Sequence, residues 1–201
     1  MHKDLTVVIQ AGGQSSRMGT DKGLVPLAGK LMIEHIISKV DLLGDELILV
    51  TNDTASYAYF GLRMVSDEEP GAGALPGLKT ALTAATGTYV LIVACDMPFL
   101  NRDLLKHQID LAFDTGQDVV IPRWDGHLQT MHAIYKKESC LPAVTYALED
   151  NQKRMISFFP SVHVHKIEPD EVAQYDPSGR SFLNINTPEE LIEAEKLIRS
   201  L

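Results

Sequence analysis

The sequence predicts an α/β fold in which a mostly parallel sheet carries helices on both faces. Two continuous apolar runs, Leu5–Gln10 and Tyr89–Ala94, are typical of parallel strands that are covered on both sides. Segments with helical spacing of apolar residues separate such runs through the first half of the chain. This alternation gives right-handed βαβ units, and ligands of such sheets bind beyond the carboxyl ends of the strands.

The other elements follow from the same patterns. Met32–Leu43 carries an apolar stripe at helical spacing, and Gly44 suits a helix end. Asn101 is a predicted N-cap for a helix that reaches Phe113. Thr187 precedes a proline at the first helical position and a capping-box glutamate, and so starts a last helix. Further strands are expected at Glu46–Thr51, Leu62–Val65 and Asp118–Ile121, and further helical segments at Gly77–Ala85 and up to about Leu201.

Composition excludes several classes of protein. With 45% apolar and 22% charged residues, the 201-residue chain is an ordinary globular protein and is long enough to bury a core of its own. Its net charge of −9 argues against non-specific binding to nucleic acid. The apolar stretch of six residues after Met1–Asp4 is too short for a signal peptide or a membrane span. Cys95 and Cys140 lack zinc-type spacing, so we expect reduced packing thiols in a cytoplasmic protein.

The region from about Trp124 to Pro177 mixes strand, helix and proline signals. We interpret it as an insertion on the same domain that carries contacts to a second ligand. The whole chain, residues 1–201, is then expected to be a single domain.

A glycine-rich loop directly after the first strand predicts a phosphate-binding site. Gly12 and Gly13 let backbone N–H groups approach an anion, Arg17 offers a planar fork for phosphate oxygens, and Lys22 adds a compact charge. Neither the Walker pattern nor the dinucleotide fingerprint is present. The alternative is a turn with two solvated cations, but the strand in front and the two cations favour phosphate binding.

Asp96, in Cys95-Asp96-Met97-Pro98, follows the strongest predicted strand and is a candidate ligand of Mg²⁺. This cation usually takes one or two carboxylates together with phosphate oxygens of the substrate. The alternative is an aspartate that caps a turn.

Other candidates depend more on their surroundings. Asp67 suits a ribose hydroxyl, a base or a metal-bound water, but equally a solvated acidic turn. The loop Gly71–Gly77 either lines a base or sugar or is an ordinary connection. Asn184 and Asn186 point the same way if the chain is extended, and bind either substrate or local backbone. Three further polar residues are candidates only for contacts with a second substrate, the acceptor: His127, Gln129 and His132.

The segments IQAGGQSSRMGTDKGL, ACDMPFL and FLNINTPEEL, in this order, strongly resemble the molybdenum cofactor guanylyltransferase family. The resemblance runs from Val7 to about Leu191 and implies a Rossmann-like fold of the nucleotide-diphospho-sugar transferase type. It divides the chain into a nucleotide-binding half at about 1–122 and an acceptor-side part with the C-terminal helix at about 123–201. It also implies transfer of GMP from GTP to the terminal phosphate of molybdopterin, release of pyrophosphate, and Mg²⁺ as cofactor.

The resemblance further implies roles for single residues and contacts with other proteins. Transient contacts with donor or acceptor proteins of the molybdenum cofactor are expected, and none with nucleic acid or membrane. Asp96 would ligate Mg²⁺, and Asn184 and Asn186 would form a second polar cluster on the acceptor side. The catalytic set is Arg17, Lys22 and Asp96, and the nucleotide-binding set is Gln10, Ala11, Gly12, Gly13, Lys22, Asn52, Asp67, Gly77 and Asp96.

Three positions depart from the family pattern. Gln10 stands where leucine is usual, Pro76 is displaced within Gly73–Gly77, and Thr130 stands where proline is common.

Two rival functions stay open at this point. One is another nucleotidyltransferase, which uses CTP on molybdopterin or a triphosphate on a sugar phosphate. The other is a non-catalytic nucleotide or cofactor carrier, which would bind without releasing pyrophosphate.

Overall fold

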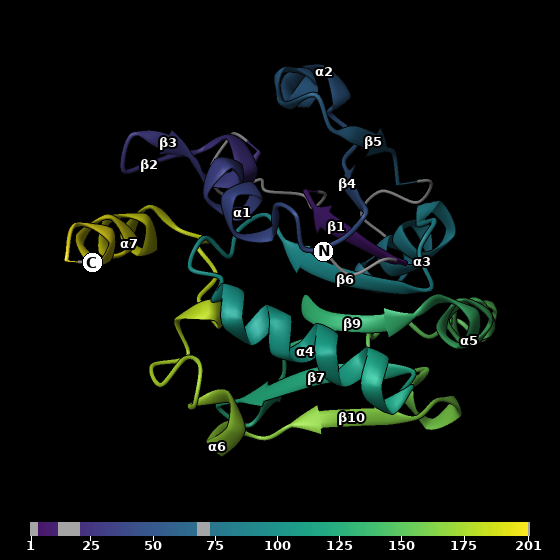
Figure 1. The fold of residues 1–201 in the computed structure, drawn as a ribbon. Coiled ribbons are helices and arrows are strands. Elements are labelled where there is room, and N and C mark those ends of the chain that lie inside the picture. Colours follow the sequence, from purple (N-terminus) through teal and green to yellow (C-terminus); the bar gives the residue numbers. More distant parts are fainter. Residues whose placement is uncertain (1–3, 12–20, 68–72, 201) are drawn as a thin grey trace.

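The computed structural model describes residues 4–11, 21–67 and 73–200, and in this part of the chain nearly all strands belong to one sheet (Figure 1). Its strand order is β10-β7-β9-β6-β1-β4-β5, with a short strand, β8, beside β7. The strands are β1 (Leu5–Gln10), β4 (Glu46–Val50), β5 (Arg63–Val65), β6 (Tyr89–Ala94), β7 (Val119–Trp124), β8 (His127–Leu128), β9 (His132–Lys136) and β10 (Val164–Ile167). A separate hairpin joins β2 (Pro26–Leu27) to β3 (Lys30–Leu31).

Four neighbouring strands, β5, β4, β1 and β6, run parallel, as predicted. Their last residues are in register, since Gln10 pairs with both Val50 and Ala94, and Val50 pairs with Val65. The segments that follow these strands therefore leave the sheet at one edge, where the sequence places its candidate site.

The region from Trp124 to Pro177 is not an insertion, and this expectation was wrong. It supplies β9, which lies inside the sheet between β6 and β7 and runs antiparallel to both, and the edge strand β10. β9 has only five residues and begins with a histidine, so it lacks the apolar run that marks β1 and β6. Its place is fixed by pairing with strands far away in the sequence.

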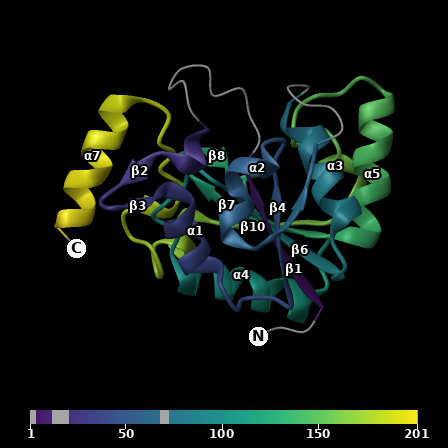
Figure 2. The same ribbon diagram turned by 90° about the horizontal axis from the view of Figure 1, so that it is seen from above.

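Helices cover both faces of the sheet (Figure 2). On one face α1 (Met32–Val40) and α4 (Arg102–Thr115) pack into one apolar core, and on the other α3 (Ala74–Ala84) and α5 (Lys137–Glu149) pack into a second. The last helix, α7 (Pro188–Arg199), packs against β2. Short helical turns complete the chain: η1 (Lys22–Leu24), α2 (Thr54–Tyr57), η2 (Ala58–Phe60), η3 (Phe159–Ser161), α6 (Pro169–Val172) and η4 (Arg180–Phe182).

Both predicted caps are confirmed. Asn101 accepts hydrogen bonds from the backbone N–H groups of Asp103 and Leu104 at 2.9 and 3.0 Å. Thr187 and Glu190 form the capping box of α7. The end of α1 differs, because the helix stops at Val40 and Leu42 takes a left-handed conformation with φ of 59°.

Candidate active site

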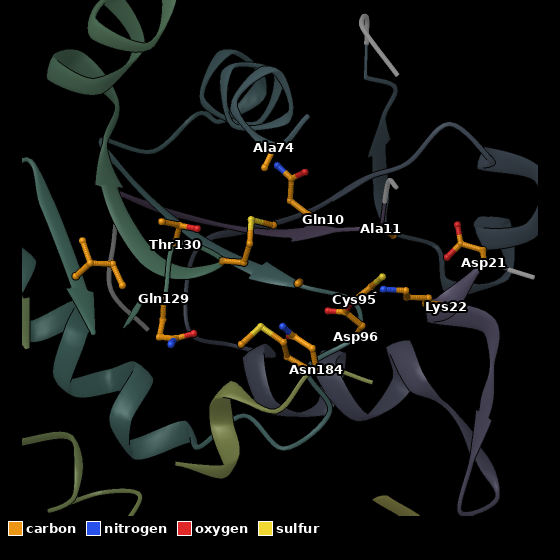
Figure 3. Close-up of a pocket in the computed structure, with 14 residues that line it drawn as sticks. Gln10, Ala11, Asp21, Lys22, Ala74, Cys95, Asp96, Gln129, Thr130 and Asn184 are labelled. Carbon is orange, nitrogen blue, oxygen red and sulfur yellow. Dashed lines mark hydrogen bonds and ion pairs between the residues drawn. The ribbon is translucent and has the colours of Figure 1, made fainter. Parts of the chain in front are cut away.

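A pocket of about 360 Å³ opens at the carboxyl ends of β1 and β6 (Figure 3). One wall comes from the parallel half of the sheet and from the start of α3, and the opposite wall from the segment before β9 and from Asn184. Its lining residues are Gln10, Ala11, Asp21, Lys22, Ala74, Ala94, Cys95, Asp96, Met97, Leu128, Gln129, Thr130, Met131 and Asn184. The topology thus brings six separate segments of the chain to one site.

The ammonium group of Lys22 links two predicted site residues. Its Nζ atom donates to Oδ2 of Asp96 at 2.9 Å and to Oδ1 of Asn186 at 2.5 Å. The side chains of Lys22 and Asp96 are both half-buried, so this ion pair is partly shielded from water. Figure 3 shows these two side chains pointing toward each other across the pocket. The structure therefore joins residues that lie 74 and 164 positions apart.

Each member of this group is held by its own backbone contacts. Asp96 follows β6, and its carbonyl oxygen accepts a hydrogen bond from the N–H of Ile185 at 2.9 Å. Asn186 is fixed by Glu190, whose carboxylate accepts from the backbone N–H of Asn186 at 2.6 Å. The capping box of α7 thus also positions a site residue.

Gln10 and Ala11, at the end of β1, line the pocket on the side of α3. The side-chain amide of Gln10 donates to the carbonyl oxygen of Gly77 at 2.8 Å. Gly77 lies within α3, beside the Gln10 side chain, and does not itself line the pocket. A contact between Gly77 and a nucleotide therefore stays a prediction.

The other predicted residues lie at or near the same edge. Asn184 lines the pocket, whereas Asn52 is exposed just after β4. Asp67 follows β5, and its carboxylate accepts from the hydroxyl of Thr80 at 3.2 Å. The loop residues Gly12, Gly13 and Arg17 fall outside the described residues, as does the start of the Gly71–Gly77 loop.

The three residues predicted to contact the acceptor lie in three different environments. Gln129 lines the pocket, and His127 is exposed on β8. His132 is fully buried, with its ring 5.1 Å from that of Phe182, so its assignment as an acceptor contact was wrong. Burial lowers the pKa of His132 to about 4, and the imidazole is neutral at pH 7.

Several pocket residues were missed by sequence reasoning, most importantly Asp21. Its carboxylate accepts from the N–H of Gly23 and from the hydroxyl of Tyr57. The only sign in the sequence that Asp21 belongs to the site is its position directly before Lys22.

Cys95 also faces the pocket, and burial raises the pKa of its thiol well above the usual range, so it is a neutral lining group.

A divalent cation suits the oxygen atoms of this site. Lys22 already places a positive charge between a carboxylate oxygen of Asp96 and the amide oxygen of Asn186, which shows that both oxygens point at one position. Carboxylate and amide oxygens are the donors that hard cations prefer, and Mg²⁺ commonly takes few protein ligands beside phosphate oxygens. The residues present therefore fit such an ion.

Within the described part of the chain, no helix combines the length and apolar character that crossing a bilayer requires.

Comparison with known proteins adds a family to this geometry. Residues 7–164 match the model of the MobA-like NTP transferase domain. A Carboxydothermus hydrogenoformans protein named "Probable molybdenum cofactor guanylyltransferase" is 36% identical over 197 residues, which cover 98% of this chain and 96% of that protein. A protein of the same name from Natranaerobius thermophilus is 35% identical and covers 98% of both chains.

Solved structures show the same fold at lower identity. Molybdopterin-guanine dinucleotide biosynthesis protein A from Archaeoglobus fulgidus superposes with a TM-score of 0.83 at 24% identity, over 98% of this chain and all of that one. A 4-diphosphocytidyl-2C-methyl-D-erythritol synthase from Anaerococcus prevotii gives 0.73 at 17% identity, over 98% and 96%. These likenesses confirm the predicted fold class. The extensive match to the family model and to the curated relatives means that this chain belongs to the molybdenum cofactor guanylyltransferase family of nucleotidyltransferases.

Proposed function

We propose that this protein transfers GMP from GTP to the terminal phosphate of molybdopterin, forms the guanine dinucleotide cofactor and releases pyrophosphate. The observation that carries the proposal is the group of Lys22, Asp96 and Asn186 in a pocket at the carboxyl edge of the sheet. It rests also on the relatives that are named probable molybdenum cofactor guanylyltransferases. A cytoplasmic location and transient contacts with proteins that donate or accept the cofactor belong to the same proposal.

The two walls of the pocket suggest how the substrates are divided. The parallel half of the sheet, with Gln10, Ala11 and the start of α3, would hold the nucleotide, as sheets of this type bind ligands at that edge. The antiparallel side, with Gln129, Thr130 and Asn184, would then face molybdopterin. Lys22 and Asp96 line the same pocket, and the phosphate groups of the two substrates would meet beside them.

Nucleotidyl transfer requires the protein to position the two substrates and to stabilise the negative charge of the phosphates. A phosphate oxygen of the acceptor attacks the α-phosphorus in line while pyrophosphate leaves. Because this nucleophile is already an anion, no general base is required. Lys22 would stabilise negative charge on the leaving pyrophosphate, and Arg17 would add to this from the glycine-rich loop.

Asp96 and Asn186 would hold Mg²⁺. When bound, the cation would neutralise phosphate charge and help to orient the reacting groups. In this structure the ammonium group of Lys22 binds the same two oxygens, so binding of a cation there would require the Lys22 side chain to turn toward the phosphates.

The deciding experiment measures pyrophosphate release with each of the four nucleoside triphosphates, with and without molybdopterin. We expect release with GTP that depends on molybdopterin and on Mg²⁺. Preference for CTP, or turnover with a sugar phosphate in place of molybdopterin, would replace the proposal by one of its rivals. Binding of GTP without release under any condition would contradict it.

The metal assignment is tested by Asp96→Asn, which removes a charge with little change in volume. We expect the variant to fold and bind GTP but to lose turnover. Near wild-type activity in saturating Mg²⁺ would reject Asp96 as the metal ligand.

A further inference from the structure

A buried tyrosine stands behind the segment that carries Lys22. The hydroxyl of Tyr57 donates a hydrogen bond to Oδ1 of Asp21 at 2.5 Å. Tyr57 is fully buried, while Asp21 lines the pocket. This bond therefore ties the pocket wall to a different part of the chain, 36 residues further on.

Both ends of this bond are held by local structure. Tyr57 is the last residue of α2, a short helix capped by Asp53, whose carboxylate accepts from the N–H of Ser56 at 3.2 Å. Its ring also packs near that of Phe60, with centroids 6.1 Å apart. The hydroxyl reaches Asp21 only because position 23 is a glycine, since a Cβ atom on Gly23 would clash with it.

The bonded oxygen of Asp21 has a second task. Oδ1 of Asp21 also accepts from the backbone N–H of Gly23 at 3.1 Å and thereby caps η1, the helical turn that Lys22 begins. The orientation of this carboxylate thus sets the backbone from which the Lys22 side chain reaches Asp96 and Asn186.

We infer that Tyr57 is a positioning residue for the reaction: its hydroxyl fixes the Asp21 carboxylate, which in turn holds the backbone turn from which Lys22 reaches into the pocket. This inference rests on the proposed guanylyl transfer. In a partly buried site, a hydroxyl bonded to a carboxylate is a strong constraint, because the acceptor is charged. Small displacements of a group that acts on a transition state slow the chemical step strongly.

Tyr57→Phe removes the hydroxyl and keeps the ring. We expect kcat with GTP and molybdopterin to fall about tenfold, as for the loss of one hydrogen bond to a charged group, while KM for GTP changes little. Tyr59→Phe is the matched control, since Tyr59 lies two residues away on the same segment and is 89% exposed. It is expected to keep wild-type kinetics, and both variants are assayed at a temperature where urea titrations show them fully folded.

Two measurements separate positioning from a merely structural role. In a double-mutant cycle, Tyr57→Phe should have little further effect on kcat in a Lys22→Ala background, because the group that it positions is gone. Without any substrate, acetylation of Lys22 by acetic anhydride should become severalfold faster in Tyr57→Phe, relative to the exposed Lys39.

The two proposals fail differently. If wild-type protein releases no pyrophosphate with any triphosphate, the proposed function is wrong, and the acetylation rates still test the role of Tyr57. If Tyr57→Phe leaves the Lys22 acetylation rate unchanged, or lowers kcat equally with and without Lys22, the positioning role is overturned.

Discussion

The side-chain amide of Gln10 donates a 2.8 Å hydrogen bond to the carbonyl oxygen of Gly77, and thereby joins the end of β1 to the first turns of α3. Gln10 lies so close that a Cβ atom on Gly77 would stand 2.8 Å from its Oε1 atom. The close Gln10 side chain thus explains why position 77 is a glycine, although glycine is a poor helix former.

This relationship predicts that Gly77→Ala destabilises the protein. The helix gains about 1 kcal/mol from alanine. The end of the Gln10 side chain can move away from the new methyl group, but it then gives up its hydrogen bond to Gly77, and a buried amide left unpaired costs about 1–3 kcal/mol. The free energy of unfolding should therefore fall or at best stay level. In a Gln10→Ala background the obstacle is absent, and Gly77→Ala should then stabilise. Urea denaturation of the two single variants and the double variant measures this difference. Equal effects of Gly77→Ala in both backgrounds would contradict the packing argument.

Lys22→Ala should lower kcat far more than it raises KM for GTP. An interaction that is made only with charge developing in the transition state acts on kcat, whereas uniform binding acts on KM. A loss of roughly 100-fold is expected for removal of one such charge. Lys30→Ala, on the exposed β2–β3 hairpin, is the control. A pure KM effect would make Lys22 a binding residue only.

The capping box of α7 also supports the site, which predicts a double effect of Glu190→Ala. The glutamate carboxylate accepts from the backbone N–H groups of Asn186 and Thr187 at 2.6 and 3.1 Å. Its loss should cost about 1 kcal/mol of stability and lower turnover, because Asn186 contacts Lys22. Glu189→Ala, in the same first turn but outside the capping box, should leave turnover unchanged. Thermal unfolding and initial rates of both variants provide the measurement.

His132 predicts a loss of stability in acid. Its pKa is about 6.5 in the unfolded chain and about 4 when folded, because burial disfavours the charged ring more than nearby Asp176 favours it. The unfolded chain therefore takes up the proton first as the pH falls. The stabilisation from this residue is complete above pH 6.5 and declines between pH 6.5 and 4, by roughly 3 kcal/mol in total.

His132→Asn should flatten this part of the stability curve, whereas the exposed His127→Asn should not. Urea titrations between pH 4 and 7.5 give the comparison. If the asparagine variant folds poorly, NMR titration of the His132 ring in the wild-type protein serves instead. A ring that titrates near pH 6.5 in the folded state would contradict the prediction.

The parts of the fold that the sequence predicts are those with strong local signals. The strands β1 and β6 are buried on both faces and appear in the sequence as continuous apolar segments. Asn101 and Thr187 are residue types that commonly cap helices, and each marks the start of the helix that follows it. β9 carries no such signal, because its position depends on antiparallel pairing with strands that lie elsewhere in the chain.

The candidate site divides in the same way. Lys22 and Asp96 are conspicuous because charged residues follow buried strands at the ligand edge. Tyr57 and Asp21 were not singled out, since a hydrogen bond between positions 36 residues apart leaves no pattern in a single sequence. His132 shows the opposite error, because a histidine in a short segment gives no sign of whether its ring faces a ligand or the core.

The hydrogen bond between Lys22 and Asn186 joins residues 164 positions apart in the sequence, and this separation determines when the site can form during protein synthesis. During translation Lys22 leaves the ribosome long before Asn186, which emerges only after the described strands of the sheet have been made. Closing so long a loop is entropically costly and waits for the sheet to hold its ends together. Until then, Lys22 lacks its contact with the Asn186 side chain. Under the proposed function, the site therefore becomes complete only after the sheet has formed, and we expect a nascent chain that lacks Asn186 to be inactive.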